Sequence, residues 1–258
     1  MPLESRFVRV ANFSLHCVTN IASFESASAP QIVRQVPVVL VHGLNISGHY
    51  LLPLAKELNP IVPILIPDLL GYGKSSHSWP PLGLKRFAAI LRQLLIELDY
   101  PKAHFVGNSF GCQIIVELAA SFPEIVDRLV LQSPTMDPSA RNPLVALSRC
   151  LRNAAQEPSD LNWLTLRENL SVCPLRAAYT LLQALRDRPE NKLPRIEAPT
   201  LVVWGSSDVI TSRQWAERVV TLLRHGSLAI LPGVTHTANY VAPVELSNAI
   251  LSFLRTTD

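Results

Sequence analysis

The sequence predicts an α/β fold: a mostly parallel, doubly wound sheet with an inserted helical cap. Short apolar, β-branched runs alternate with helix patterns along most of the chain, and one proline-containing stretch interrupts that alternation. Strands that alternate with helices imply crossover connections and parallel pairing. We therefore expect an α/β core made of residues 1–133 and 200–258, and a helical cap (lid) over 134–199.

The first part of the chain is predicted to be largely extended. An extended start over 7–19 leads to a segment rich in serine and alanine, 23–31, that we expect to form a loop or a wide hairpin turn. The run Val36–Val41 is short, apolar and β-branched, which is typical of a strand buried on both faces of a parallel sheet. A helix over 47–58 and a strand over 61–66 follow.

The central elements flank a turn that contains two glycines. From Phe87 to Leu98, apolar residues recur with the 3.6-residue period of an amphipathic helix. The sequence then predicts a strand over 104–108, an almost wholly apolar helix over 110–121, and a strand over 128–132. An apolar helix of this kind fits a position buried beside a central strand.

The cap region contains no convincing strand. Pro143 and Pro174 suit the first turn of a helix, and Ser159 with Asp160 could cap another, so we expect about three helices here. After the cap the alternation resumes, with a strand over 200–204, a helix over 213–223, a strand over 228–231 and a helix over 244–254.

Composition limits the classes of function. The 258 residues are enough for one sizeable core, and the formal net charge of +3 is spread out without a dense basic tract, so nucleic acid is not an expected partner. Four widely spaced cysteines and unpaired histidines indicate neither a disulfide framework nor a metal site. Without a leader pattern or a membrane-spanning run, we expect a cytoplasmic monomer or homodimer that acts on a small molecule.

The segment Gly107-Asn-Ser-Phe-Gly111 fits the G-x-S-x-G pattern of a nucleophile elbow. The pattern alone is weak, because glycine and serine are common, and an ordinary strand-to-helix turn is the alternative. Its context strengthens it, since an apolar strand precedes Ser109 and a helix follows. A serine hydroxyl becomes a nucleophile near neutral pH only with a base and an acid to assist it.

Candidates for the acid and the base follow the elbow in the expected order. Asp208 lies just past the strand over 200–204, and His236 lies in a loop after the last predicted strand. Asp137, after an earlier strand, is a rival acid, but we favour Asp208. Among the other histidines, His42 ends a strand and could line the pocket.

An acyl-transfer enzyme must also stabilise an oxyanion. Two backbone amides are candidates: that of Phe110, which follows the nucleophile at a helix start, and that of Leu44, which follows His42-Gly43. Asn108 precedes Ser109, and we expect Asn108 to contact the substrate together with His42.

These motifs together resemble the α/β-hydrolase fold family in its lidded, single-domain form. The resemblance spans almost the whole chain and rests on the motifs Val41-His-Gly43, Pro67-Asp-Leu-Leu-Gly-Tyr-Gly-Lys-Ser75, Gly107–Gly111, Val203-Trp-Gly-Ser-Ser-Asp208 and Pro232-Gly-Val-Thr-His236. It implies a serine hydrolase that needs no cofactor and no metal.

Two differences from subgroups of this family narrow the range of expected activities. Relatives that cleave C–C bonds in aromatic ring-fission products share an asparagine before the serine, but they typically place tryptophan after the histidine, where this chain has Thr237. Dehalogenases and many epoxide hydrolases use an aspartate nucleophile, so Ser109 argues against both.

We therefore predict a carboxylic ester hydrolase for a small or medium acyl substrate, working through an acyl-enzyme. The alternatives are a C–C bond hydrolase of a diketone-acid-type substrate and a non-catalytic ligand receptor on the same fold. Between Arg141 and Arg195 the cap holds nine basic and five acidic residues. Solvated helix faces explain this excess most simply; the sharper hypothesis is that Arg176 or Arg186 holds a substrate carboxylate.

Overall fold

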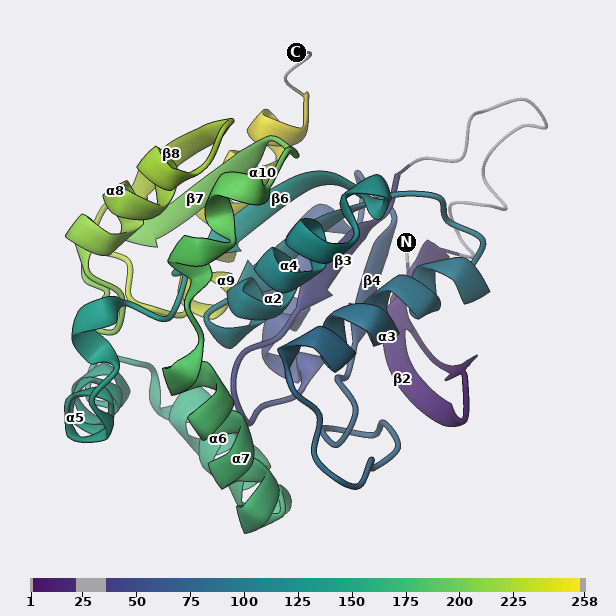
Figure 1. The fold of residues 1–258 in the computed structure, drawn as a ribbon, viewed down its shortest axis with the longest axis horizontal. Coiled ribbons are helices and arrows are strands. Elements are labelled where there is room, and N and C mark those ends of the chain that lie inside the picture. Colours follow the sequence, from purple (N-terminus) through teal and green to yellow (C-terminus); the bar gives the residue numbers. More distant parts are fainter. Residues whose placement is uncertain (1, 22–35, 256–258) are drawn as a thin grey trace.

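The computed structural model describes residues 2–21 and 36–255, so the predicted loop over 23–31 lies outside the described residues. Eight strands form one sheet in the order β1-β2-β4-β3-β5-β6-β7-β8, with helices packed on it (Figure 1). The strands are β1 Glu4–Val10, β2 Phe13–Thr19, β3 Val38–Val41, β4 Ile64–Pro67, β5 Ala103–Asn108, β6 Val126–Gln132, β7 Thr200–Gly205 and β8 Gly226–Leu231.

The sheet is parallel except at one edge, which confirms the predicted fold class. The hairpin of β1 and β2 pairs antiparallel to β4, whereas the pairs from β4 through β3, β5, β6 and β7 to β8 are all parallel. At the centre, Val41 of β3 lies beside Gly107 of β5, and Asn108 lies beside Gln132 of β6. The carboxyl ends of these strands therefore meet at one edge, where α/β sheets bind ligands.

Two apolar clusters cover the two faces of the sheet, because successive strand residues point to opposite sides. In β3, Val39 and Val41 belong to one cluster, and Val38 and Leu40 belong to the other. The first cluster takes in helices α3 Leu84–Glu97, α4 Phe110–Ser121 and α8 Arg213–Leu222, and the second takes in α2 Leu52–Leu58, α9 Ala238–Val241 and α10 Pro243–Arg255. None of the helices described is both long and apolar enough to cross a bilayer.

Most predicted elements lie within a few residues of those observed, and α4 has the predicted bounds. Helix α3 begins three residues earlier than its apolar stripe suggests, because Gly83 is extended and Leu84 already packs in the core. The predicted helix over 47–58 is instead a 3₁₀ helix, η1 Gly48–Leu51, followed by α2. Pro53 lies in the first turn of α2, where its missing N–H costs no helical hydrogen bond.

A helical insertion separates β6 from β7, as predicted. It contains α5 Pro143–Ala154, α6 Ser159–Ser171 and α7 Pro174–Arg186, together with short 3₁₀ turns. Both prolines begin helices, whereas Ser159 is the first residue of α6 rather than its cap. The three helices lie beyond one end of the sheet (Figure 1). We call residues 134–199 the insertion below.

Candidate active site

Ser109 occupies the sharp turn between β5 and α4. Its backbone has φ 55° and ψ −115°, a region that non-glycine residues seldom adopt. The two flanking glycines permit this turn: a Cβ on Gly107 would lie 2.7 Å from the carbonyl carbon of Gly111, and a Cβ on Gly111 would clash with the carbonyl oxygen of Val41. This strand–turn–helix geometry is the structural context that a nucleophile elbow requires.

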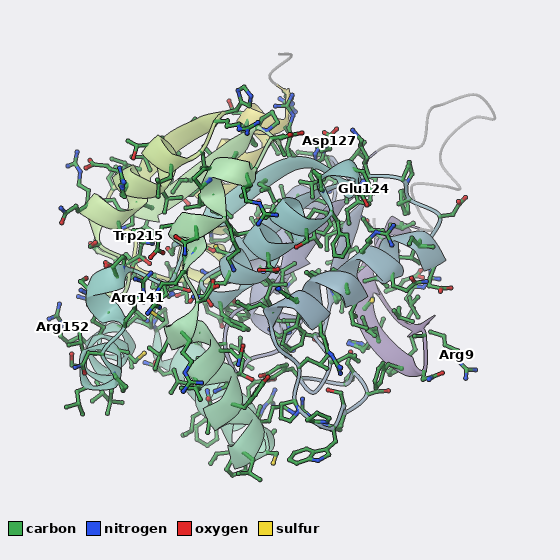
Figure 2. The ribbon with its side chains drawn as sticks, viewed as in Figure 1. Arg9, Glu124, Asp127, Arg141, Arg152 and Trp215 are labelled. Atoms are coloured by element: carbon green, nitrogen blue, oxygen red, sulfur yellow. The ribbon has the colours of Figure 1, made fainter. Side chains whose placement is uncertain are left out.

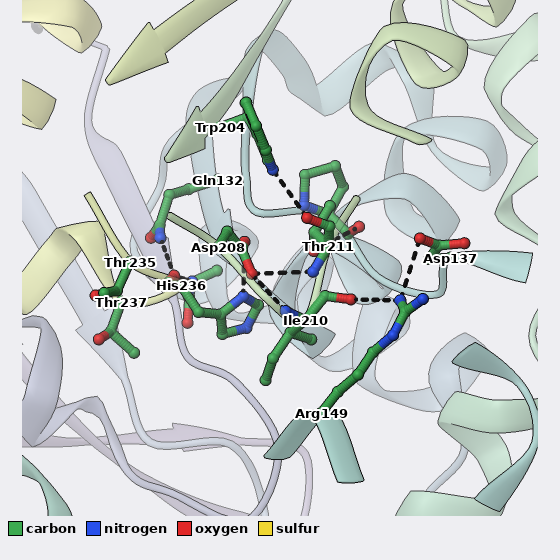
Figure 3. Close-up of polar contacts among 12 residues, drawn as sticks. Gln132, Asp137, Arg149, Trp204, Asp208, Ile210, Thr211, Thr235, His236 and Thr237 are labelled. Carbon is green, nitrogen blue, oxygen red and sulfur yellow. Dashed lines mark hydrogen bonds and ion pairs between the residues drawn. The ribbon is translucent and has the colours of Figure 1, made fainter. Parts of the chain in front are cut away.

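His236 and Asp208 are brought together at the carboxyl end of the sheet (Figure 3). The Nδ1 atom of His236 lies 3.0 Å from Oδ2 of Asp208, and both residues are buried. The other carboxylate oxygen of Asp208 accepts hydrogen bonds from the amides of Ile210 and Thr211, at 2.8 and 2.9 Å. A carboxylate fixed in this way favours the tautomer of His236 whose Nε2 is free to take a proton.

Each of these two side chains stabilises the charged form of the other, and this contributes to a raised pKa for His236 and a lowered pKa for Asp208. Burial by itself lowers the pKa of His236, but the charge and hydrogen bond of Asp208, with the charge of Glu157, raise this pKa above its ordinary value. Burial raises the pKa of Asp208, yet His236 and the two backbone amides lower it, with a net downward shift. Asp208 is therefore ionised at neutral pH.

The rival acid, Asp137, has other contacts. Its Oδ1 accepts from the amide and hydroxyl of Ser139, at 2.8 and 2.6 Å. Its Oδ2 lies 3.3 Å from Nη1 of Arg149 (Figure 3) and 3.3 Å from the amide of Ser212. Asp137 thus orders the start of the insertion, and of the two candidate acids Asp208 is the one that contacts His236.

A cavity of about 360 Å³ lies between the core and the insertion. Ser109, His236 and Asn108 line it from the sheet side, and helices α5, α6 and α7 contribute its other walls. Leu44 and Phe110 also line it. Because Phe110 is the first residue of α4, its amide has no partner within the helix and lies at the positive end of the helix dipole. Both predicted oxyanion donors therefore belong to residues at the cavity that holds Ser109.

A hydrogen-bond network holds the backbone of His236. Its carbonyl oxygen accepts from Nε2 of Gln132, at 2.8 Å, and from Nδ2 of Asn108, at 3.3 Å. The Oδ1 atom of Asn108 accepts from the hydroxyl of Tyr50, at 2.6 Å, and that hydroxyl accepts from the amide of Gly43, at 2.8 Å. Sequence reasoning missed Tyr50 and Gln132. Gln132 could have been found, because it ends the predicted strand over 128–132 just as Asn108 ends the predicted strand over 104–108, and the structure pairs these two residues.

His42, which we expected to contact the substrate, is fully buried and is not among the residues that line the cavity, and both of its ring nitrogens make contacts inside the protein. Its Nε2 accepts from the amide of Leu69, at 2.9 Å, and its Nδ1 lies 3.0 Å from the carbonyl oxygen of Gly43. The pKa of this fully buried imidazole is lowered, and burial is the main cause. His42 therefore joins the loops that follow β3 and β4.

The two predicted carboxylate-binding arginines also lie away from the cavity. Arg176 is buried with its Nη2 2.5 Å from the carbonyl oxygen of Ser78, and its guanidinium packs against Gly71. Arg186 is exposed and borders a separate hollow beside Lys85. The regular pattern of α7 identifies the helix but not the face turned to the cavity, which carries Leu181 and Ala184 instead.

Arg149 is the arginine of the insertion that lines the cavity. Its Nη1 donates to the carbonyl oxygen of Ile210, at 2.9 Å, as well as facing Asp137, and its Nη2 lies 2.8 Å from Oγ of Ser139. Arg152, one turn further along α5, is exposed and points away from the molecule (Figure 2).

Comparison with known proteins agrees with this architecture. Residues 36–172 match the sequence pattern of the α/β hydrolase fold. The chain belongs to the α/β-hydrolase fold family. A 2-hydroxy-6-oxononadienedioate/2-hydroxy-6-oxononatrienedioate hydrolase from Cupriavidus pinatubonensis is 25% identical to this α/β hydrolase, over 97% of this chain and 95% of the relative.

Solved structures show the same fold. A thermophilic esterase from Thermogutta terrifontis superposes on this α/β hydrolase with a TM-score of 0.78, at 19% identity over 98% of both chains. A 2-hydroxy-6-oxo-6-phenylhexa-2,4-dienoate hydrolase from a Rhodococcus strain gives a TM-score of 0.76, at 18% identity over 99% of both chains. The protein is a hydrolase of this family. The relative from Cupriavidus is named for a dienedioate substrate, and the solved structures with the same fold include an esterase and a dienoate hydrolase.

Proposed function

We propose that this α/β hydrolase is a serine hydrolase that cleaves a carboxylic ester of a small or medium acyl group through an acyl-enzyme. One observation carries the proposal: Ser109 sits in a strained elbow at the same cavity as His236, whose imidazole contacts the buried carboxylate of Asp208. Nucleophile, base and orienting acid are the parts that serine acyl transfer needs.

The reaction would run in two halves. His236 Nε2 takes the proton of Ser109 Oγ as that oxygen attacks the ester carbonyl, and the amides of Leu44 and Phe110 donate to the resulting oxyanion. His236 then gives the proton to the departing alcohol, which leaves an acyl group on Ser109. A water molecule, deprotonated by His236, attacks the acyl carbon. The bond from that carbon to Ser109 Oγ then breaks, His236 returns the proton to this oxygen, and the acid is released. Asp208 stays ionised and keeps the imidazole oriented throughout.

Hydrolysis of a C–C bond is the second candidate. It is supported by the name of the Cupriavidus relative and by Asn108 before the serine, although Thr237 stands where the C–C hydrolases typically have tryptophan. Asn108 reaches the cavity wall, but its side-chain amide already bonds to Tyr50 and to the backbone of His236.

Turnover assays separate these functions. We expect p-nitrophenyl esters of graded acyl length to be hydrolysed, with a maximum at short or medium chains, because the cavity is only about 360 Å³. Vinylogous diketone acids should be turned over much more slowly than esters. The reverse order of kcat/KM would assign C–C hydrolysis. Labelling of Ser109 by a fluorophosphonate without turnover of any ester or diketone acid would instead indicate a ligand receptor.

A further inference from the structure

Glu157 brings a carboxylate from the insertion to the histidine loop. It lies between α5 and α6, is 8% exposed and lines the cavity. Its Oε2 accepts from the hydroxyl of Thr235, at 3.1 Å, and its Oε1 accepts from the amide of Thr237, at 3.3 Å. The carboxylate therefore bonds to the residues on either side of His236. The amide of Glu157 is held in turn by the carbonyl oxygen of Asn153, at 3.0 Å.

The negative charge of Glu157 has no cationic partner in the described part of the chain, where no basic nitrogen forms an ion pair with it. The other two charged side chains of the insertion that line the cavity, Arg149 and Asp137, compensate each other. Arg149 faces Asp137 at 3.3 Å, and its remaining donors bond to the carbonyl oxygen of Ile210 and to Ser139. The insertion therefore presents one neutralised ion pair and the uncompensated carboxylate of Glu157 to a substrate in the cavity.

An uncompensated charge in a cavity acts strongly on a ligand, because the protein walls screen it less than bulk water does. A substrate carboxylate placed near Glu157 would be repelled and would also lose its hydration. A neutral group would not be repelled, and a cation would be attracted. The charge on this wall is thus opposite in sign to the arginine expected from the sequence.

We propose that Glu157 selects substrates by charge: the cavity accepts esters whose acyl and alcohol parts are neutral or cationic, and it discriminates against esters that carry a carboxylate. This inference rests on the proposed ester hydrolysis and specifies its substrate class. Glu157 acts here as a specificity-determining residue, while the bond-breaking steps remain with Ser109, His236 and the two amides.

The same charge also acts on the base. The charged groups that affect His236 are Asp208, from the loop after β7, and Glu157, from the insertion; the compensated pair of Asp137 and Arg149 lines the same cavity. Against the lowering effect of burial, Asp208 and then Glu157 raise the pKa of His236. Removing the charge of Glu157 should lower this pKa, so the acid limb of kcat/KM should move to lower pH.

Matched esters test the selectivity. We would measure kcat/KM at pH 8 for three p-nitrophenyl esters of equal acyl length whose chains end in a methyl, a trimethylammonium or a carboxylate group. The wild-type enzyme should prefer the first two over the third by about tenfold or more, as expected for one unit charge about 10 Å away at an effective dielectric constant near 20. Glu157→Gln should reduce that preference by about tenfold and shift the acid limb downward.

Glu217→Gln is the matched control, since Glu217 is an exposed residue of α8 that pairs with Arg213. It should leave both the preference and the acid limb unchanged. Glu157→Asp keeps the charge and should keep the preference for the neutral ester. Equal wild-type values for the neutral and anionic esters would overturn the proposal, and so would an unchanged ratio in a folded Glu157→Gln enzyme.

The wild-type comparison needs no variant, so equal values for the neutral and anionic esters would overturn the proposal even if Glu157→Gln fails to fold. The failures of the two proposals look different. A chain that hydrolyses none of the three esters refutes ester hydrolysis itself. Hydrolysis that is abolished in Ser109→Ala but shows no charge preference refutes only the role of Glu157.

Discussion

At the scale of single residues, Ser109 and Glu157 show what sequence reasoning reaches and what it misses. Ser109 lies in a motif whose glycines are required by close backbone approach, so the pattern predicts both its turn and its position. Glu157 belongs to no motif. It reaches the loop that holds His236 only because the segment between α5 and α6 folds back onto that loop, with Thr235 and Thr237 as its partners. Only the structure shows that Glu157 lies against Thr235 and Thr237.

The choice between two acids gives the first prediction. Asp208→Asn should reduce kcat by a factor on the order of 10⁴, because an amide at this position favours the wrong tautomer of His236. Asp137→Asn should leave most turnover intact, since Asp137 bonds to Ser139 and Arg149 instead. Steady-state kinetics of both variants provide the measurement. A crippling effect of Asp137→Asn with a mild effect of Asp208→Asn would exchange their roles.

The second prediction concerns pH. The base must be neutral to accept a proton, so kcat/KM should fall as the pH drops through the pKa of His236. Burial lowers that pKa, but Asp208 and Glu157 raise it by more, so the midpoint of the acid limb should lie above the ordinary value of 6.5. A pH profile with a neutral ester tests this, and a midpoint at or below 6.5 would contradict it.

At the scale of elements, the strands and helices of the core follow from local patterns, because each has a buried face whose period can be read. Helix α4 agrees with prediction in both bounds, and the parallel strands end where the candidate site residues begin. The orientation of the insertion helices is harder to predict from the sequence. Its helix starts at Pro143 and Pro174 were predictable, but α5 has no buried residue and α7 exposes several leucines. Their patterns therefore do not reveal which face lines the cavity.

The elbow gives a prediction for an element junction. In Gly111→Ala the new methyl would clash with the carbonyl oxygen of Val41 and lie 2.9 Å from that of His42, both of them backbone atoms. We expect a loss of about 3 kcal/mol in the free energy of unfolding, together with slower labelling of Ser109. Urea unfolding and fluorophosphonate labelling measure the two effects.

Gly83→Ala serves as the control for this substitution. A Cβ on Gly83 would lie 3.3 Å from Oε1 of Gln183, the end of a flexible side chain, and Gly83 has an ordinary extended backbone. The cost should be below about 1 kcal/mol, mainly from a poorer helix cap. Equal destabilisation by the two alanines would mean that close packing at the elbow does not set the requirement for glycine.

At the scale of the whole molecule, the fold class and the order of the candidate site residues were predictable, whereas the substrate contacts were not. Motif spacing places Ser109, Asp208 and His236 after three different strands, β5, β7 and β8, and these parallel strands end at one edge of the sheet. The other half of the cavity depends on how three insertion helices pack on the core. That packing turns Arg176 toward Ser78 and brings Arg149 and Glu157 to the cavity wall.

Locating the covalent adduct tests the central claim most directly. The enzyme would be treated with a fluorophosphonate, digested, and analysed by mass spectrometry, with Ser109→Ala treated in parallel. We expect a single adduct on Ser109, no adduct in the alanine variant, and a fall in ester turnover on the order of 10⁶ in that variant, which should keep the wild-type unfolding midpoint. An adduct on another residue, or an alanine variant that retains ester turnover, would contradict the assignment of Ser109 as the nucleophile.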